Sequence, residues 1–337
     1  MSTTLVRPRR LTAVLAAVTA AVVGVAACSS GSSASTVRLV AYSVPKPAYD
    51  ALGKAFAKTK DGKDVEVKGS YGPSGSQSKA VIGGQKADYV GFSVEPDLTK
   101  LVDAGKVEKN WNSGPTKGLV SDSVVVIVVR QGNPLGIKGW DDLVKPGVKI
   151  VTPDPATSGS AKWNILAAYT HILSEGGTDV AAQAYLKKFY KNIVSRAQSG
   201  ATATTQFTSG TGNVLISYEN EAISARAKGA KLDYIVPEQS ILIENPAAVT
   251  KGASDGAKKF LSYVESEAGQ EIFAAHGFRP VVKSTKIPTV AGANDPSNPF
   301  PTVSKLTTIA QLGGWSAVNK KFFDEKTGIV TKIGGAG

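Results

Sequence analysis

The 337-residue sequence contains a single cysteine, Cys28, and two histidines, His171 and His276. One cysteine excludes a disulfide within the chain. Both histidines lie in segments with helical spacing, without a nearby serine elbow or metal-ligand pattern. The sequence also lacks the glycine–lysine phosphate loop, the dinucleotide fingerprint and the Gly-x-Ser-x-Gly elbow. These absences argue against an enzyme and predict neither a metal nor a cofactor.

The charge is positive overall but is not concentrated in one stretch. Lysine and arginine number 39 against 27 acidic residues, which gives a formal net charge of +12. The lysines between Lys54 and Lys68 are scattered over predicted solvated helix faces, without the basic stripe or aromatic platform of a nucleic-acid surface. We therefore predict no nucleic-acid partner, and only a mild attraction for anions.

The first 27 residues have the features of a bacterial export signal. Three arginines precede an uncharged apolar run over residues 11–27, and Cys28 follows directly after small residues. This pattern predicts a lipoprotein signal peptide over residues 1–27, lipidation of Cys28 and a flexible Ser/Gly/Ala tether over residues 28–35. The lipid would hold the exported protein at the outer face of the cytoplasmic membrane. An ordinary secretory signal and a short uncleaved membrane helix are the alternatives.

Strand-like and helix-like segments alternate along the rest of the chain, which predicts an α/β fold with parallel sheets. Residues 123–130 form a continuous run typical of a strand buried on both faces. The length favours two lobes. Because this buried strand and the segment near residue 244 bracket the second set of elements, the chain is expected to cross between the lobes twice. The predicted parts are lobe 1 (36–122 plus 245–300), lobe 2 (123–244) and a C-terminal helical segment (301–337).

Three corners carry serine between a predicted strand and a predicted helix, and two of them also carry glycine. They lie at residues 40–45, 71–77 and 156–164, and none has a lysine or arginine at its apex. A helix start leaves backbone N–H groups unpaired, and the helix dipole favours an anion there. Ligands of open α/β sheets bind beyond the carboxyl ends of strands, where these corners lie. Taken singly, each corner also fits an N-cap or a turn; together they predict a receptor for a small oxyanion held by uncharged donors.

Several motifs in order along the chain resemble the sulfate-binding proteins of bacterial ABC importers, in particular their actinobacterial lipoprotein branch. The motifs are Val40-Ala41-Tyr42, Ser74-Gly75, Lys145-Pro146-Gly147-Val148, Thr152-Pro153-Asp154-Pro155, Ser158-Gly159 with Trp163-Asn164, Glu219-Asn220-Glu221-Ala222 and Gly313-Gly314-Trp315. The resemblance covers residues 36–323. It implies a two-lobe type II periplasmic-binding-protein fold with hinge crossovers and a ligand cleft between the lobes. It further implies a monomer that delivers sulfate to the permease subunits of an ABC transporter.

The resemblance also implies which residues contact the ligand, through hydroxyls and backbone N–H groups. These residues are Ser43, Ser74, Ser158, Gly159, Ser160, Ala201 and Tyr218. Ser43 stands where relatives carry aspartate, Ser160 replaces a glycine, and Tyr218 replaces a tryptophan whose indole donates. The loop before Ala201 is one residue shorter than in the family, so the register there can shift by one. A phenol donates from a different place than an indole, which leaves the fine selectivity open.

Sulfate suits a site made of donors because it carries no proton at neutral pH and only accepts hydrogen bonds. Hydrogen phosphate brings a proton that needs an acceptor. Asp154, Glu219 and Glu221 are interpreted as capping or supporting carboxylates outside the pocket, since one inside it would repel sulfate. Molybdate, tungstate and thiosulfate remain alternative ligands. A surface lipoprotein that senses anions without transporting them is the alternative role.

Overall fold

The structure is a computed structural model that describes residues 35–334. The predicted signal peptide, the lipidation site Cys28 and nearly all of the predicted tether lie outside the described residues. The last tether residue, Ser35, is already the first residue of a strand. Within the described range, no helix has the length and apolar character needed to cross a membrane.

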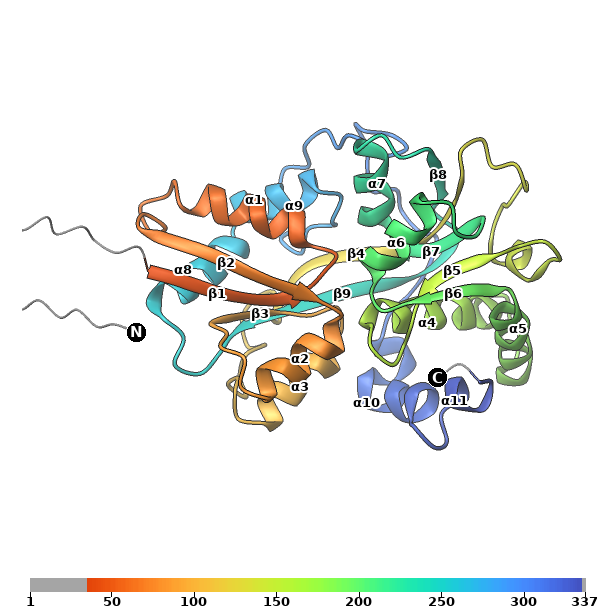
Figure 1. Ribbon diagram of the computed structural model, residues 1–337, viewed down its shortest axis with the longest axis horizontal. Coiled ribbons are helices and arrows are strands. Elements are labelled where there is room, and N and C mark those ends of the chain that lie inside the picture. The colour runs from red at the N-terminus through yellow and green to blue at the C-terminus, as the bar shows by residue number, and fades with distance from the viewer. Residues whose placement is uncertain (1–34, 335–337) are drawn as a thin grey trace, which may run out of the picture. The chain divides into compact units, whose positions relative to one another are not determined.

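The first lobe is built on a parallel three-stranded arrangement, with β1 between β2 and β3 (Figure 1). The last four residues of β1 are all buried. The strands are β1 (Ser35–Tyr42), β2 (Val65–Gly72) and β3 (Tyr89–Gly91). The helices packed on them are α1 (Lys46–Phe56), α2 (Ser74–Ile82), α3 (Glu95–Asp103), α8 (Asp255–Val264) and α9 (Glu267–Ala275).

The second lobe repeats the parallel arrangement, with β5 paired to both β6 and β7. Helices α4 and α5 lie on one side of this sheet in Figure 1, and α6 and α7 on the other. The strands are β5 (Ile150–Pro153), β6 (Ile193–Ala197), β7 (Val214–Tyr218) and β8 (Leu232–Ile235). The helices are η1 (Trp140–Val144), α4 (Gly159–Ser174), α5 (Asp179–Lys191), α6 (Gly200–Thr208) and α7 (Glu219–Ala227).

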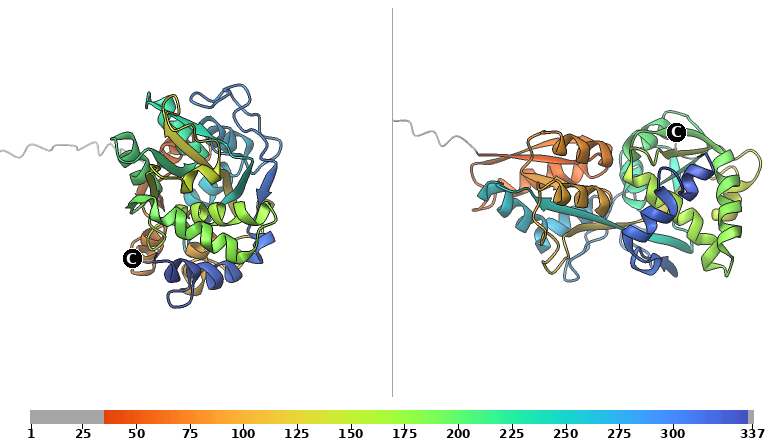
Figure 2. Two further views of the ribbon diagram at one scale, coloured as in Figure 1. Left: turned by 90° about the vertical axis from the view of Figure 1, so that its right-hand side faces the viewer. Right: turned by 90° about the horizontal axis from the view of Figure 1, so that it is seen from below.

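Two long antiparallel strands, β4 (Leu119–Arg130) and β9 (Gln239–Val249), connect the lobes (Figure 2). The first part of β4 pairs with β9, and the second part pairs with β7 and β8. The β-branched run 124–129 is almost completely buried, as its sequence predicts for a strand covered on both faces. The predicted lobe boundaries, after residues 122 and 244, fall inside these two strands.

The C-terminal segment packs on the second lobe and is not purely helical. Its strand β10 pairs with β9, and Trp315 meets Trp163 of α4 edge-on with 4.9 Å between ring centroids. Such an aromatic pair adds about 0.5–1.5 kcal/mol to the free energy of area burial. This contact helps to fix the helix whose N-terminus faces the other lobe. The elements are β10 (Lys305–Thr307), η2 (Ala310–Leu312), α10 (Gly314–Val318), η3 (Asn319–Phe323) and α11 (Ile329–Lys332).

Candidate functional site

Five strand-to-helix corners, three from the first lobe and two from the second, line one small pocket. They follow β1, β2, β3, β5 and β6, so the pocket lies beyond the carboxyl ends of these strands, as open α/β sheets favour. No lining residue in the described part of the chain has a charged side chain. The lining consists of Tyr42, Ser43, Gly72, Pro73, Ser74, Ser93, Ser158, Ser160, Ser199 and Gly200.

Helix α4 is the longest of the helices that begin at this pocket. Ser158 is its N-cap residue, but within residues 35–334 its hydroxyl makes no capping hydrogen bond. The Ser158 N–H donates to the Asp154 carbonyl at 2.8 Å. The first N–H groups of the helix, beginning with Gly159 and Ser160, have no partner inside the helix. The Ser158 hydroxyl and these amides can therefore serve an anion, which the helix dipole favours.

Gly159 allows the two lobes to approach each other closely. A β-carbon placed on Gly159 would lie 2.7 Å from Ser93 Oγ and 3.2 Å from Val94 Cγ1, both in the first lobe. The neighbouring backbones also bond across the cleft, where the Gly75 N–H donates to the Thr157 carbonyl at 3.2 Å. The structure is thus a closed arrangement, and a side chain at position 159 would obstruct it.

The Ser74 hydroxyl is already used within its own lobe. It donates to Asp97 Oδ2 at 2.8 Å and accepts from the Ser93 N–H at 3.1 Å. Asp97 in turn pairs with Lys100 at 3.1 Å. Because a hydroxyl has only one hydrogen, the donor that Ser74 can offer the pocket is its backbone N–H, at the first position of α2.

Tyr218 stands behind the pocket lining. Its side chain is fully buried, and its hydroxyl lies 2.6 Å from Ser93 Oγ. Burial raises the pKa of Tyr218, while hydrogen bonds with Ser93, Ser160 and Asn245 oppose the rise. The phenol is therefore protonated at neutral pH and reaches the pocket through Ser93.

The corner before α6 places Gly200 in the pocket lining, and Ala201 at a separate cavity of about 510 Å³. A β-carbon on Gly200 would lie 2.9 Å from Glu221 Oε2 and 3.0 Å from Ser160 Oγ. Ser199 caps the helix by accepting from the Thr202 N–H at 3.1 Å. The pocket lining thus includes Gly200 and not the predicted Ala201, a difference of one residue in register.

The two nearby glutamates are buried but do not line the small pocket. Glu219 forms a two-point pair with Arg279, at 2.7 and 3.0 Å, and this pair opposes the rise of its pKa by burial. Burial raises the pKa of Glu221 to about 7, although Ser217 Oγ donates to it at 2.8 Å. No histidine, cysteine, aspartate or glutamate group in residues 35–334 is placed to hold a metal ion.

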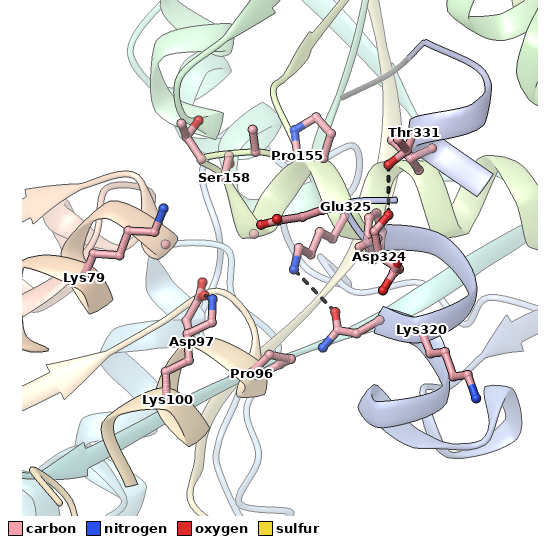
Figure 3. Close-up of a pocket in the computed structure, with 18 residues that line it drawn as sticks. Lys79, Pro96, Asp97, Lys100, Pro155, Ser158, Lys320, Asp324, Glu325 and Thr331 are labelled. Carbon is pink, nitrogen blue, oxygen red and sulfur yellow. Dashed lines mark hydrogen bonds and ion pairs between the residues drawn. The ribbon is translucent and has the colours of Figure 1, made fainter. Parts of the chain in front are cut away.

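A cavity of about 710 Å³ adjoins the small pocket, and Ser158 borders both (Figure 3). Lys79 and Lys100 lie on its first-lobe side, with Lys320 and Asp324 on the C-terminal segment opposite. Lys162 also lines it, with its ammonium 3.4 Å from Asn319 Oδ1. Asp97, Asp324 and Glu325 line the same cavity, so charged side chains of both signs lie beside the small pocket but not in its lining.

Ser93 lines the pocket from a corner that sequence reasoning missed entirely. It precedes α3, whose start carries Pro96 together with Glu95 and Asp97 in its first turn. Proline in the first turn followed by acidic residues is a recognisable helix start. That signal could have identified the β3–α3 junction as a further corner.

Comparison with known proteins places this chain in a family. Residues 37–279 match the family described as bacterial extracellular solute-binding protein. The sulfate-binding protein of Synechococcus elongatus is 39% identical over 325 residues, covering 91% of each chain. The thiosulfate-binding protein of Pseudomonas aeruginosa is 32% identical over 84% of this chain and 88% of that protein.

Solved structures agree in fold. The structure of the sulfate-binding protein SubI from Mycobacterium tuberculosis matches with a TM-score of 0.80 at 42% identity, covering 86% of this chain and all of that chain. The periplasmic binding protein AfuA from Actinobacillus pleuropneumoniae shares the fold with a TM-score of 0.64 at 21% identity, over 85% of this chain and 96% of that chain. The predicted two-lobe α/β fold and the predicted resemblance are thereby confirmed: the chain belongs to the bacterial extracellular solute-binding proteins.

Proposed function

We propose that this protein is an extracytoplasmic receptor that captures sulfate between its lobes and delivers it to an ABC importer. The observation that carries the proposal is the small pocket, where hydroxyls and helix-start amides from five corners converge without a charged side chain. Relatives named sulfate-binding proteins support the choice of ion.

The donor chemistry favours an oxyanion without a proton. Each charge-assisted hydrogen bond is worth about 1.5–3 kcal/mol, and several are needed to offset the cost of removing a dianion from water. Amides at helix starts meet this need because they are fixed in direction before the ligand arrives. A protonated ligand such as hydrogen phosphate would turn its own donor toward these donors, and that unpaired hydrogen costs about 1–3 kcal/mol.

The proposed ligand contacts follow from the geometry above. Ser158 contributes its hydroxyl, whereas Ser74, Gly159 and Ser160 contribute backbone N–H groups. Ser43 contributes from the β1–α1 corner. The α6 corner contributes through the backbone at Gly200. Release would follow opening about β4 and β9, the two strands that cross between the lobes.

Isothermal titration of the purified protein with sulfate tests the proposal. The expected result is 1:1 binding with a dissociation constant on the order of micromolar, which corresponds to about 8 kcal/mol. Phosphate at neutral pH should bind roughly 5- to 150-fold more weakly, as the cost of its unpaired hydrogen predicts. Absence of sulfate binding, or equal competition by phosphate, would remove sulfate as the ligand.

Thiosulfate is the second candidate ligand, because a thiosulfate-binding protein is among the relatives at 32% identity. It has the same charge and a similar shape, and the titration above ranks it directly. Molybdate belongs in the same series, since it is tetrahedral and larger.

The proposal includes a monomeric protein held at the outer face of the cytoplasmic membrane by a lipid on Cys28. Several acyl chains, at about 0.8 kcal/mol per buried CH₂, would suffice for stable anchoring. Fractionation of cells that express the Cys28→Ala variant tests the anchor. Release of that variant into the soluble exported fraction is expected, and retention in the membrane would contradict it.

A further inference from the structure

Ser93 lies at the contact between the lobes and also lines the small pocket. It is completely buried, and its backbone is fixed from three directions. The Ser93 N–H donates to Ser74 Oγ at 3.1 Å. The Ser93 carbonyl accepts from Trp163 Nε1 at 2.8 Å and from Asn245 Nδ2 at 3.1 Å. Its side chain is therefore held in one place when the lobes are closed.

The Ser93 hydroxyl meets Tyr218 of the second lobe at 2.6 Å, the short distance of a strong hydroxyl–hydroxyl hydrogen bond. Among the described residues, Tyr218 is the hydrogen-bond partner of Ser93 Oγ. Either hydroxyl of this pair can be the donor, and each has a single hydrogen to give.

This pairing bears on where the Ser93 hydroxyl hydrogen points. If Tyr218 donates to Ser93 Oγ, the Ser93 hydrogen is left to be donated to a different acceptor. Ser93 Oγ lies against the start of α4, since a β-carbon on Gly159 would come within 2.7 Å of it. The amides of that helix start face the same pocket. An anion bound there would accept the Ser93 hydrogen.

We propose that Ser93 is a ligand-binding residue that donates its hydroxyl hydrogen to the bound oxyanion, and that Tyr218 is a positioning residue that orients this hydrogen across the closed cleft. This inference rests on the proposed oxyanion-binding function. It gives the closed form a contact that the open form lacks, because Ser93 and Tyr218 come from different lobes. Ligand binding and closure would then reinforce each other through one hydroxyl pair.

A double-mutant cycle tests the inference, with sulfate as the probe and isothermal titration as the measurement. Ser93→Ala removes the donor, and we expect its sulfate affinity to fall roughly 10- to 100-fold. Tyr218→Phe keeps the Ser93 hydroxyl but removes the group that orients it, and we expect a smaller loss of sulfate affinity, roughly 3- to 10-fold. The double variant should bind as Ser93→Ala does. Tyr49→Phe is the matched control, because Tyr49 forms a buried hydroxyl pair with Tyr89, at 3.1 Å, outside the pocket.

The outcomes separate the inference from the proposed function. Wild-type protein that fails to bind sulfate would overturn the proposed function itself. If the wild type binds, an unchanged Ser93→Ala affinity would overturn the role of Ser93. A Tyr218→Phe loss of equal size in the Ser93→Ala background would overturn the coupling, because the two side chains would then act independently.

A second measurement does not depend on any variant folding. In a crystal structure of the wild-type protein with sulfate, Ser93 Oγ should lie within hydrogen-bond distance of a sulfate oxygen, about 2.5–3.0 Å. Tyr218 Oη should contact Ser93 and not the sulfate. A sulfate bound by the Tyr218 hydroxyl directly, with Ser93 turned away, would overturn the inference.

Discussion

The small pocket and the larger cavity beside it share Ser158 but differ in the charge of their walls. The pocket is lined by hydroxyls, backbone and an aromatic ring, whereas lysines and acidic residues line the cavity. Lysines attract many anions from a distance, since their field depends little on ligand shape. Fixed uncharged hydrogen-bond donors act only at contact, so the affinity that they give depends on the ligand's shape and on how many protons it carries. This difference between a charged cavity and an uncharged pocket is the reason for proposing that the ion binds in the pocket.

The largest expected effect comes from obstructing closure of the uncharged pocket. Gly159→Ala places a methyl group against Ser93 Oγ, at 2.7 Å without relaxation. We expect sulfate affinity to fall about 100-fold or more, because closure must then displace the first lobe. Stability of the ligand-free protein should hold, since alanine is a good helix residue. Titration and small-angle scattering with sulfate would measure both affinity and closure.

The matched control for this substitution is Gly139→Ala. Gly139 has extended backbone dihedrals, and a β-carbon there would meet nothing within 4 Å. Its sulfate affinity should equal that of the wild type. If Gly159→Ala also binds and closes normally, the lobes do not need the close approach seen here.

A smaller effect is expected when one donor is removed from the pocket. Ser158→Ala should weaken sulfate binding by about 1–3 kcal/mol with little loss of stability, because its hydroxyl makes no capping bond among the described residues. Ser254→Ala should instead lower the stability and leave sulfate affinity unchanged. Ser254 caps α8 by accepting from the Ala257 N–H at 3.3 Å, so its loss should cost about 1 kcal/mol of stability. Titration and urea unfolding of both variants would show this exchange, and unchanged binding by Ser158→Ala would exclude that residue from the site.

The mildest effect concerns Glu221, the carboxylate that lies behind Gly200. Burial raises its pKa from 4.5 to about 7, so the folded protein retains a proton that the unfolded chain releases. The free energy of unfolding should therefore decline by about 2 kcal/mol as the pH rises from about 4.5 to about 7. Because the side chain in Glu221→Gln cannot ionise, the free energy of unfolding of this variant should not show this decline with pH. Urea unfolding at pH 5 and pH 8 would measure it.

Glu219→Gln is a control for Glu221→Gln, because both remove one buried carboxylate beside the pocket. It removes the charge that pairs with Arg279 and should lower stability at both pH values, because the partly buried guanidinium loses its charged partner. An unchanged pH dependence in Glu221→Gln would mean that Glu221 is ionised in the folded protein. The uncharged character of the pocket surroundings would then be wrong.

The sequence could predict the elements whose local pattern agrees with their environment. The buried run in β4 and the glycine–serine start of α4 are both present as expected. Short elements without such a pattern escaped prediction. Strand β6 (Ile193–Ala197) is one, since its Arg196 interrupts a five-residue segment. Helix α3 escaped for a different reason: its first turn carries the recognisable Pro96 and Asp97, but its serine lies two residues before the helix.

Contacts between distant residues could not be read from local patterns. Ser93 and Tyr218 are 125 residues apart in the sequence, and only the folded chain brings their hydroxyls together. The family pattern predicts Tyr218 as a direct donor, and in the structure its hydroxyl lies 2.6 Å from Ser93 Oγ; the direct contact with a ligand stays a prediction. Whether the backbone at Ala201 or at Gly200 contacts a ligand also stays a prediction. The residue types at the corners predict uncharged donors, whereas tertiary packing determines which of their atoms line the pocket.

The most direct test of the account removes the cavity lysines and leaves the pocket intact. Lys79, Lys162 and Lys320 are changed together to glutamine, and Lys100 is kept because it pairs with Asp97. Sulfate is then titrated calorimetrically at about 0.5 M salt, where long-range attraction is screened. The account predicts a dissociation constant within about twofold of the wild type, since a twofold change is well below one hydrogen bond. A tenfold or greater loss of affinity would show that lysine charge, and not uncharged donors, holds the ion.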